Sequence, residues 1–170
     1  FGVVAWQYGW TMAAFGGLIL TAILIALTFI DADTQYLPDS LTLPLIWLGL
    51  LFNLSGTFVP LKSAVLGAVF GYMSLWLLCF IYKLLTGKIG MGNGDFKLLA
   101  ALGAWLGVGI LPVLVFMAAL IGLIGAIIGR VAKGQYFAFG PSLAIAGWII
   151  LVANEPVHHA VTWWLTKSGF

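Results

Sequence analysis

The run MAAFGGLILTAILIALTFI, residues 12–30, is followed directly by the charged residue Asp31. A helix needs roughly 17–25 predominantly apolar residues to cross a bilayer core about 30 Å thick. Apolar runs that approach or exceed this length recur at Leu41–Leu54, Ala64–Leu85 and Leu111–Ile128. The pattern predicts an all-α membrane protein with several transmembrane helices and short loops, in which Asp31 ends the first span.

The composition supports the same class. Hydrophobic residues make up 63% of the 170 residues, charged residues 7%, and the mean hydropathy is +1.15. Soluble globular domains carry about a quarter charged residues, so an ordinary soluble fold is excluded. The net charge of +2 is too small and dispersed for a nucleic-acid surface. The expected surrounding is a lipid bilayer, with no nucleic acid among the partners.

Turn residues and charges divide the chain into six predicted spans. Their approximate bounds are 11–30, 41–57, 62–85, 96–109, 111–130 and 140–153. We interpret residues 1–170 as a single transmembrane domain, with 1–10 as the end of a preceding helix and 154–170 as a tail. Because the chain starts at Phe1 without a basic leader, we expect a fragment that lacks an upstream region.

Loops alternate between the two sides of a membrane, so 31–40, 86–95 and 131–139 are expected to share one face. Positive charges are enriched in cytoplasmic loops. Five of the seven Lys and Arg residues flank this face: Lys83, Lys88, Lys97, Arg130 and Lys133. The shared face is therefore predicted to be cytoplasmic.

Acidic residues gather at the same face. Four of the five in the chain, Asp31, Asp33, Asp39 and Asp95, lie in or beside two of its loops. Carboxylates near the hydrocarbon boundary are rare unless they face a polar cavity. Ordinary solvation in a loop is an equal alternative for Asp33 and Asp39, and a solvated carboxylate at a span end is the alternative for Asp31.

Asp95 follows the glycine-rich segment 90–94 and precedes an apolar helix. A helix over 95–109 covers only roughly 21 Å at 1.5 Å per residue, which is shorter than the bilayer core. Non-helical backbone at membrane depth is tolerated only beside protein or water. The segment therefore predicts a loop that dips inward and carries Asp95 into a wet pocket. A nucleotide-binding glycine loop is excluded because no βαβ unit can surround it.

Two carboxyl groups in one pocket share a proton near neutral pH, because ionising both is unfavourable. The ionised group can take a proton from a water that attacks a peptide carbonyl, and the protonated group can stabilise the oxyanion and protonate the leaving nitrogen. Lys97 can lower the pKa of its neighbour Asp95, or it can serve as a positively charged membrane anchor. Both roles stay open at this point.

The acid-bearing segments, 31–39 followed by Leu41-Thr42-Leu43-Pro44 and 92–98, resemble the type IV prepilin leader peptidases. These belong to the Gly-x-Gly-Asp class of aspartyl proteases, which also includes presenilin. The resemblance continues through 104–107 and 139–144, so it covers most of the chain between about 27 and 150. It implies that Asp31 and Asp95 are the catalytic pair. The supporting residues are then Gly92, Gly94, Lys97, Asp33, Asp39 and Pro38.

The expected roles of Pro38 and Asp39 follow from local chemistry. Proline disfavours helix for the residue before it, and aspartate suits a helix N-cap. The segment therefore predicts that Asp39 caps the second span instead of taking part in cleavage.

The resemblance also implies a substrate and a location. Such peptidases cut the short basic leader from prepilins and from the pseudopilins of type II secretion, at the cytoplasmic face of the bacterial inner membrane. Many then N-methylate the new amino terminus with S-adenosylmethionine, an activity associated with an upstream region that often binds zinc through paired cysteines. With one cysteine, Cys79, this chain holds no such zinc site. We expect proteolysis without a metal or cofactor, and we leave methylation and the oligomeric state open.

Two other functional classes compete. A proton- or cation-coupled transporter also uses intramembrane carboxylates beside broken helices, but here the acids lie at one face and no inverted repeat is evident. A structural membrane subunit gives Asp95 no use. The small-residue pairs Gly67/Gly71, Gly103/Gly107 and Gly125/Gly129 predict helix-packing seams, one of which a helical substrate could also use. His158 and His159 are a metal pair on paper only.

Overall fold

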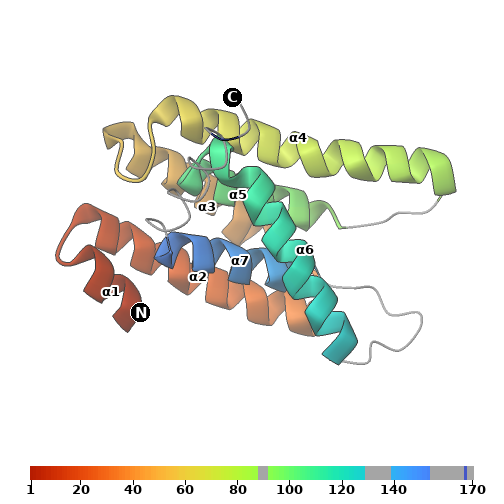
Figure 1. The fold of residues 1–170 in the computed structure, drawn as a ribbon, viewed down its shortest axis with the longest axis horizontal. Coiled ribbons are helices and arrows are strands. Elements are labelled where there is room, and N and C mark those ends of the chain that lie inside the picture. The colour runs from red at the N-terminus through yellow and green to blue at the C-terminus, as the bar shows by residue number, and fades with distance from the viewer. Residues whose placement is uncertain (88–91, 129–138, 154–166, 168–170) are drawn as a thin grey trace.

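The computed structural model describes residues 1–87, 92–128, 139–153 and 167. Within these ranges all regular structure is helical (Figure 1), so the all-α prediction is confirmed. The helices are α1 Gly2–Tyr8, α2 Met12–Thr34, α3 Asp39–Phe52, α4 Leu61–Thr86, α5 Asn93–Leu106, α6 Leu111–Ile128 and α7 Gly140–Val152, with short 3-10 turns η1 Asn53–Ser55 and η2 Val108–Ile110.

Each of the six predicted spans coincides with a helix, but the helices differ in length. Met12–Thr34, Leu61–Thr86 and Val108–Gly125 are long and apolar enough to cross a membrane. The helices α3, α5 and α7 have only 14, 14 and 13 residues, so each covers about 20 Å at 1.5 Å per residue. Its hydropathy and these three long helices identify the chain as a membrane protein, which also contains three short helices.

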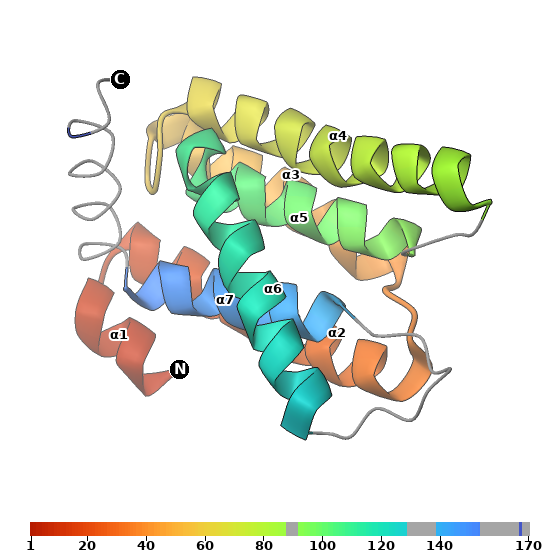
Figure 2. The same ribbon diagram turned by 45° about the vertical axis from the view of Figure 1, so that its right-hand side comes forward.

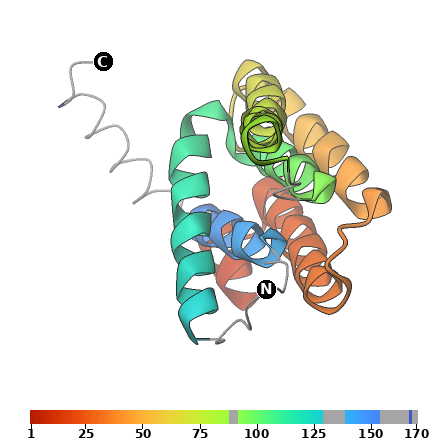
Figure 3. The ribbon, with the colours of Figure 1, turned by 90° about the vertical axis from the view of Figure 1, so that its right-hand side faces the viewer.

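The helices form two groups that meet at the centre of the molecule. In one group α5 packs against α4 and α3, and in the other α7 packs against α2 and α6. Figure 2 shows α6 crossing over α7, and Figure 3 shows α7 on the inner side of α6. Contacts between α5 and α7 join the two groups. The short helices α5 and α7 therefore occupy the interior, where they can bring side chains from both groups together.

Helix α5 is held firmly at its C-terminal end. The indole of Trp105 is fully buried and donates a hydrogen bond of 2.9 Å to the carbonyl of Leu45 in α3. Buried Asn53 donates to the carbonyl of Ala104 at 2.8 Å and accepts from the backbone amides of Phe58 and Val59. A buried amide must satisfy both its donors and its acceptor, and Asn53 does so by tying α5 to the loop after α3.

Glycines let α4 and α5 approach backbone to backbone. A Cβ atom at Gly67 would collide with the carbonyl of Gly103, and one at Gly103 would collide with that of Gly67. One at Gly71 would lie 2.8 Å from the carbonyl oxygen of Leu99. The packing seam predicted for these glycines is confirmed, whereas Gly125 has no neighbour within 4 Å. Gly129, its predicted partner, lies outside the described residues.

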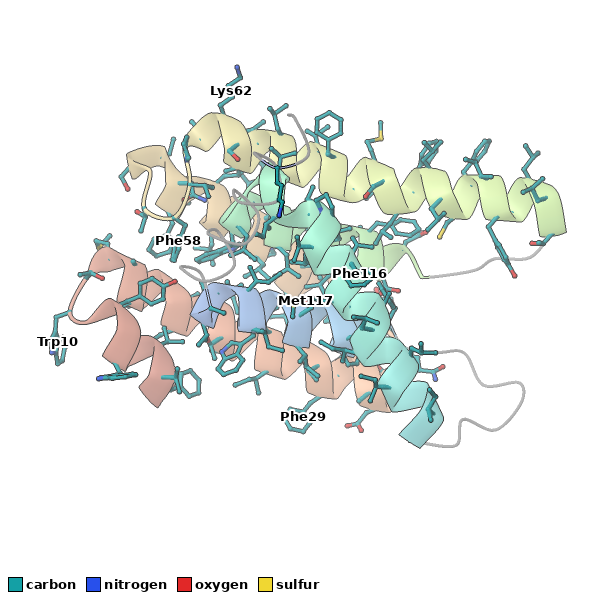
Figure 4. All side chains as sticks on the ribbon, in the orientation of Figure 1. Trp10, Phe29, Phe58, Lys62, Phe116 and Met117 are labelled. Carbon is teal, nitrogen blue, oxygen red and sulfur yellow. The ribbon has the colours of Figure 1, made fainter. Side chains whose placement is uncertain are left out.

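The outer surface is strongly apolar. Figure 4 shows Trp10 and Phe29 pointing away from the bundle, and the side chains of Trp10, Phe29 and Phe116 are exposed. Further large apolar side chains are exposed along α4, including Val69, Phe70, Met73, Trp76, Leu77, Phe80, Leu84 and Leu85. Water would disfavour such a continuous surface, whereas lipid matches it. The apolar character of the surface thus agrees with a protein that lies in a bilayer.

Candidate active site

Asp31 lies on the buried face of α2. Leu20, Leu24 and Leu27 precede it at spacings of four, three and four, which places all four residues on one side of a helix. They are 0–4% exposed. The helix continues to Thr34 and ends at Gln35, whose backbone is left-handed with a φ of 53°. Asp31 therefore lies in the last turn of the helix, at the C-terminal end of the span as predicted, and the helix continues four residues beyond the approximate bound at residue 30.

Asp95 lies in the first turn of α5, not in a loop. The helix begins at Asn93 after Gly92, which has an extended backbone, and the amide of Asp95 donates to the carbonyl of Gly92. Asp95 is 7% exposed. The apolar residues Leu98, Leu99 and Leu102 follow at helical spacing and are fully buried. Asp95 faces inward, as predicted, because its own side of α5 is buried. The loop that was expected to carry it ends at Gly92, before the helix begins.

The two carboxyl groups interact electrostatically. Asp95 is outside the three long spans, and its pKa is raised to about 7, first by burial and then by the nearby charge of Asp31. A like charge close by disfavours the ionised form, as in other carboxylate pairs. With this pKa, Asp95 holds its proton below about pH 7 and loses it above that pH.

Lys97 pairs with Asp39 and not with Asp95. Its Nζ lies 2.6 Å from Oδ1 of Asp39, and the side chains are 24% and 50% exposed. Residues two apart on a helix do not face each other, and Asp95 is itself helical, so Lys97 points away from it. Of the two roles left open for Lys97, lowering the pKa of Asp95 finds no support, because the causes that shift this pKa are burial and the charge of Asp31. The ion pair joins the first turns of α3 and α5.

The expected N-cap role of Asp39 is wrong. Pro38 occupies the N-cap position of α3, and no side chain caps this helix end. Asp39 is the first helical residue, and its carboxylate is used by Lys97. Its negative charge still lies in the first turn, where it is favourable to the helix.

Leu37 packs against residues beside both acids, and the sequence did not predict this contact. Its side chain is 4% exposed. A Cβ atom at Gly94, the residue before Asp95, would lie 2.6 Å from Cβ of Leu37. A Cβ atom at Gly140 would lie 3.1 Å from Cδ1 of Leu37 and would collide with Oδ2 of Asp31. Segments from α2, α5 and α7 thus meet around one leucine.

Leu37 and Gly140 each carry a weak signal in the sequence. Leu37 is an apolar residue between polar neighbours, and Gly140 directly precedes Pro141 at the start of α7. Neither signal specifies a neighbour, because contact between helices depends on their relative register.

The remaining predicted residues lie apart from the pair. Asp33 is exposed on another side of α2, and Gly92 is exposed with nothing within 4 Å of a Cβ atom placed on it. The described part of the chain contains no group of three or more His, Cys, Asp or Glu residues that could hold a metal ion. Lys88, Arg130, Lys133, His158 and His159 lie outside the described residues.

The arrangement is suited to proton transfer between two carboxyl groups. Oδ2 of Asp31 is buried and has no hydrogen-bond partner among the described residues. A buried carboxylate oxygen is costly without a donor, so a proton, a water or a substrate group is expected to serve it. A pair with one shared proton can donate to one reacting atom while accepting from another.

Residues 18–127 match the type IV leader peptidase family. The chain is 74% identical over 166 residues to a prepilin leader peptidase/N-methyltransferase of Neisseria gonorrhoeae, covering 98% of this chain and 58% of that protein. It is 51% identical over 173 residues to one of Pseudomonas aeruginosa, covering 99% and 59%. A relative from Aeromonas hydrophila is 55% identical over 164 residues, covering 94% and 54%. The chain thus spans a little over half the length of these relatives, and no solved structure matches it.

Proposed function

Because the chain belongs to the type IV leader peptidase family, we propose that it is the membrane-embedded peptidase domain of a prepilin leader peptidase, with Asp31 and Asp95 as its catalytic carboxyls. One observation carries the proposal: two carboxyl groups from separate helices are both buried, and burial first, then the charge of Asp31, raises the pKa of Asp95 to about 7. Contacts between α5 and α7 support treating residues 1–170 as one domain.

In the proposed reaction the pair begins with one proton. The ionised carboxylate takes a proton from water as the oxygen attacks the peptide carbonyl. The protonated partner donates a hydrogen bond to the carbonyl oxygen, where negative charge develops, and then gives its proton to the leaving nitrogen. The pair ends with one proton on the opposite member, so no net proton is gained or lost and no metal or cofactor is needed.

The supporting roles follow from the contacts. Gly94 lacks a side chain where Leu37 packs, which lets the start of α5 approach the 35–38 segment. Lys97 and Asp39 hold the first turns of α5 and α3 together, and Pro38 directs the chain into α3. We assign Asp33 and Gly92 no part in the reaction, since neither lies at the pair.

Prepilins, and by extension type II pseudopilins, are the proposed substrates, because the matching relatives are named prepilin leader peptidases. We propose cleavage at the cytoplasmic face of the bacterial inner membrane. Support comes from the basic residues on either side of the α4–α5 connection: Lys83 lies in the last turn of α4 and Lys97 near the start of α5, whereas Lys62 lies at the opposite end of α4 (Figure 4).

Methylation is proposed only for the longer protein. The relatives carry N-methyltransferase in their names. Buried polar side chains among the described residues are few, and those of Thr21, Thr42 and Asn53 are satisfied by nearby backbone groups. The rest do not form a set of donors and acceptors that would recognise both ends of S-adenosylmethionine, so we derive no methylation step here. We propose that the methyl-donor site, and any zinc site, lie in the part of the relatives that this chain does not cover.

The experiment that tests the proposal uses the purified chain in lipid nanodiscs with a purified prepilin. Mass spectrometry should show a product shortened by the leader, with a free amino terminus that carries no methyl group. The chain with Asp95→Asn, matched for folding, serves as the control and should leave the precursor intact. A folded wild-type chain that leaves the precursor uncut would contradict the peptidase and favour the coupled-transporter alternative, which a proton-flux assay on the same protein would then examine.

A further inference from the structure

A third helix reaches the proposed catalytic pair. Gly140, the first residue of α7, is buried. A Cβ atom there would collide with Oδ2 of Asp31 and would lie 3.0 Å from Cγ of the same carboxyl group. Figure 2 shows the start of α7 beside α2. Only a residue without a side chain allows α7 to begin at this distance from the acid.

The carboxyl group of Asp31 lies close enough to the backbone amide of Gly140 to interact with it. Its buried Oδ2 meets the full geometry of a hydrogen bond with no described residue. The amides of a helix's first turn have no partner within the helix, and Pro141 has no amide hydrogen, which leaves those of Gly140 and Ser142. The N-terminal end of a helix also carries partial positive charge. Asp31 lies at the C-terminal end of α2, and the partial positive charge at the N-terminal end of α7 stabilises its negative charge.

Two other glycines serve as controls for this contact. Gly147, in the same helix, is tightly packed too, with 2.5 Å between a placed Cβ atom and Cδ2 of Leu102, but its neighbour is apolar and at the end of a flexible side chain. Gly125, in α6, has nothing within 4 Å. The two positions provide one control for tight packing and one for the substitution itself.

Resting on the proposed function, we propose that Gly140 is a positioning residue for the reaction: by lacking a side chain, it lets the first turn of α7 pack on Asp31 and fix the direction of its carboxyl group toward Asp95. In the proposed mechanism, Gly140 touches neither the scissile bond nor the substrate. A displacement of a catalytic group by about 1 Å can cost about 10²-fold in rate. Substitution should therefore lower kcat and leave KM nearly unchanged.

The first test measures prepilin cleavage by Gly140→Ala, Gly147→Ala and Gly125→Ala in the full chain. We expect Gly140→Ala to lower kcat about 10²-fold at unchanged KM, and the other two to stay within a few-fold of wild type once folded. A folded Gly140→Ala that cleaves as fast as Gly147→Ala would overturn the inference. If wild type itself cleaves nothing, the proposed function fails, which is a different outcome.

A thermal double-mutant cycle tests the contact without using activity. Gly140→Ala should lower the Tm of the wild-type chain, and should lower it much less in an Asp31→Ala background, because the colliding carboxyl is gone. Gly147→Ala should lower the Tm equally in both backgrounds, since distant sites are additive. If Gly140→Ala alone does not fold, the Asp31→Ala/Gly140→Ala variant should still do so. Equal Tm losses for Gly140→Ala in both backgrounds, or equal failure to fold, would refute the contact.

Discussion

Asp31 is buried because the helix that carries it is longer than its apolar run. The buried series of Leu20, Leu24 and Leu27 extends by one more helical step to the acid. The sequence identified both acids as the proposed pair, and the 3–4 spacing of this series was there to be read. The approximate bound at residue 30 was taken from the first charge, whereas the helix continues to Thr34.

At neutral pH the proposed pair is close to losing its proton. The pKa of Asp95 is raised to about 7, so its protonated form prevails below that pH and is lost above it. The reaction needs one proton on the pair, and kcat/KM should therefore fall as pH rises above about 7, approaching tenfold per unit. Steady-state cleavage between pH 5.5 and 9 in nanodiscs measures this limb.

The control for the pH profile is Asp33→Asn. Asp33 is exposed and lies two residues from Asp31 on the helix, so its loss should leave the alkaline limb where it was. A rate that rises through pH 7 to a plateau at pH 9 would mean that the reaction does not need the shared proton.

The ion pair between Lys97 and Asp39 should matter little. The two side chains are 24% and 50% exposed, and such pairs contribute about 0–1 kcal/mol. Asp39→Asn keeps an oxygen acceptor for Lys97, so cleavage and Tm should stay close to wild type. A double-mutant cycle with Asp39→Ala and Lys97→Ala should give a coupling energy no larger than about 1 kcal/mol. Loss of cleavage in a folded Asp39→Asn variant would show instead that Asp39 takes part in the reaction.

Among the elements, α5 is the one that the sequence described least well. Its shortness was predicted from a helix over 95–109, and the observed 14 residues and their burial agree with that expectation. Its start at Asn93 was missed because glycines were taken as loop formers, whereas Gly92 and Gly94 here adopt ordinary backbone angles at and just inside the helix start. Gly94 is needed for its small size against Leu37, a contact that no local pattern could predict.

The two glycines before Asp95 should therefore respond differently to alanine. A Cβ atom at Gly94 would lie 2.6 Å from Cβ of Leu37, so Gly94→Ala should displace the start of α5, lower the Tm and reduce cleavage by about tenfold or more. Gly92→Ala meets open space at a φ of −75° and loses only about 1 kcal/mol or less as an N-cap. Melting curves and cleavage rates of the two variants test this directly.

A Gly92→Ala chain that is folded but as inactive as Gly94→Ala would contradict this reading. It would mean that the first glycine of the motif serves the substrate or the chemistry, and not only the helix start.

On the scale of the whole molecule, hydropathy was enough to predict the helices but not their partners. The six apolar segments appear as helices because each must satisfy its backbone hydrogen bonds internally in lipid. Which of them lie inside depends on glycine seams such as Gly67 with Gly103 and on the anchoring of α5 by Asn53. These contacts join residues far apart in the sequence, so a single chain's pattern could suggest close packing without naming the pairs.

The proposed orientation in the membrane makes a labelling prediction. Asp33 and Ser55 are exposed; Asp33 lies in the last turn of α2, and Ser55 lies in η1, directly after α3. In a Cys79→Ala background, Asp33→Cys should react with a membrane-impermeant maleimide only from the cytoplasmic side, and Ser55→Cys only from the opposite side. Labelling of Asp33→Cys in intact cells from outside would reverse the assignment of the site to the cytoplasmic face.

The central claim is that Asp31 and Asp95 act together in peptide-bond cleavage. The most direct measurement compares prepilin cleavage by mass spectrometry for folded Asp31→Asn, Asp95→Asn and the double variant, with Asp33→Asn as the matched control. Asparagine keeps the shape but cannot exchange the proton, so each single variant should lose activity by about 10³-fold or more, and the double variant should be no worse. Asp33→Asn should yield the mature product. Full cleavage by folded Asp95→Asn would contradict the account.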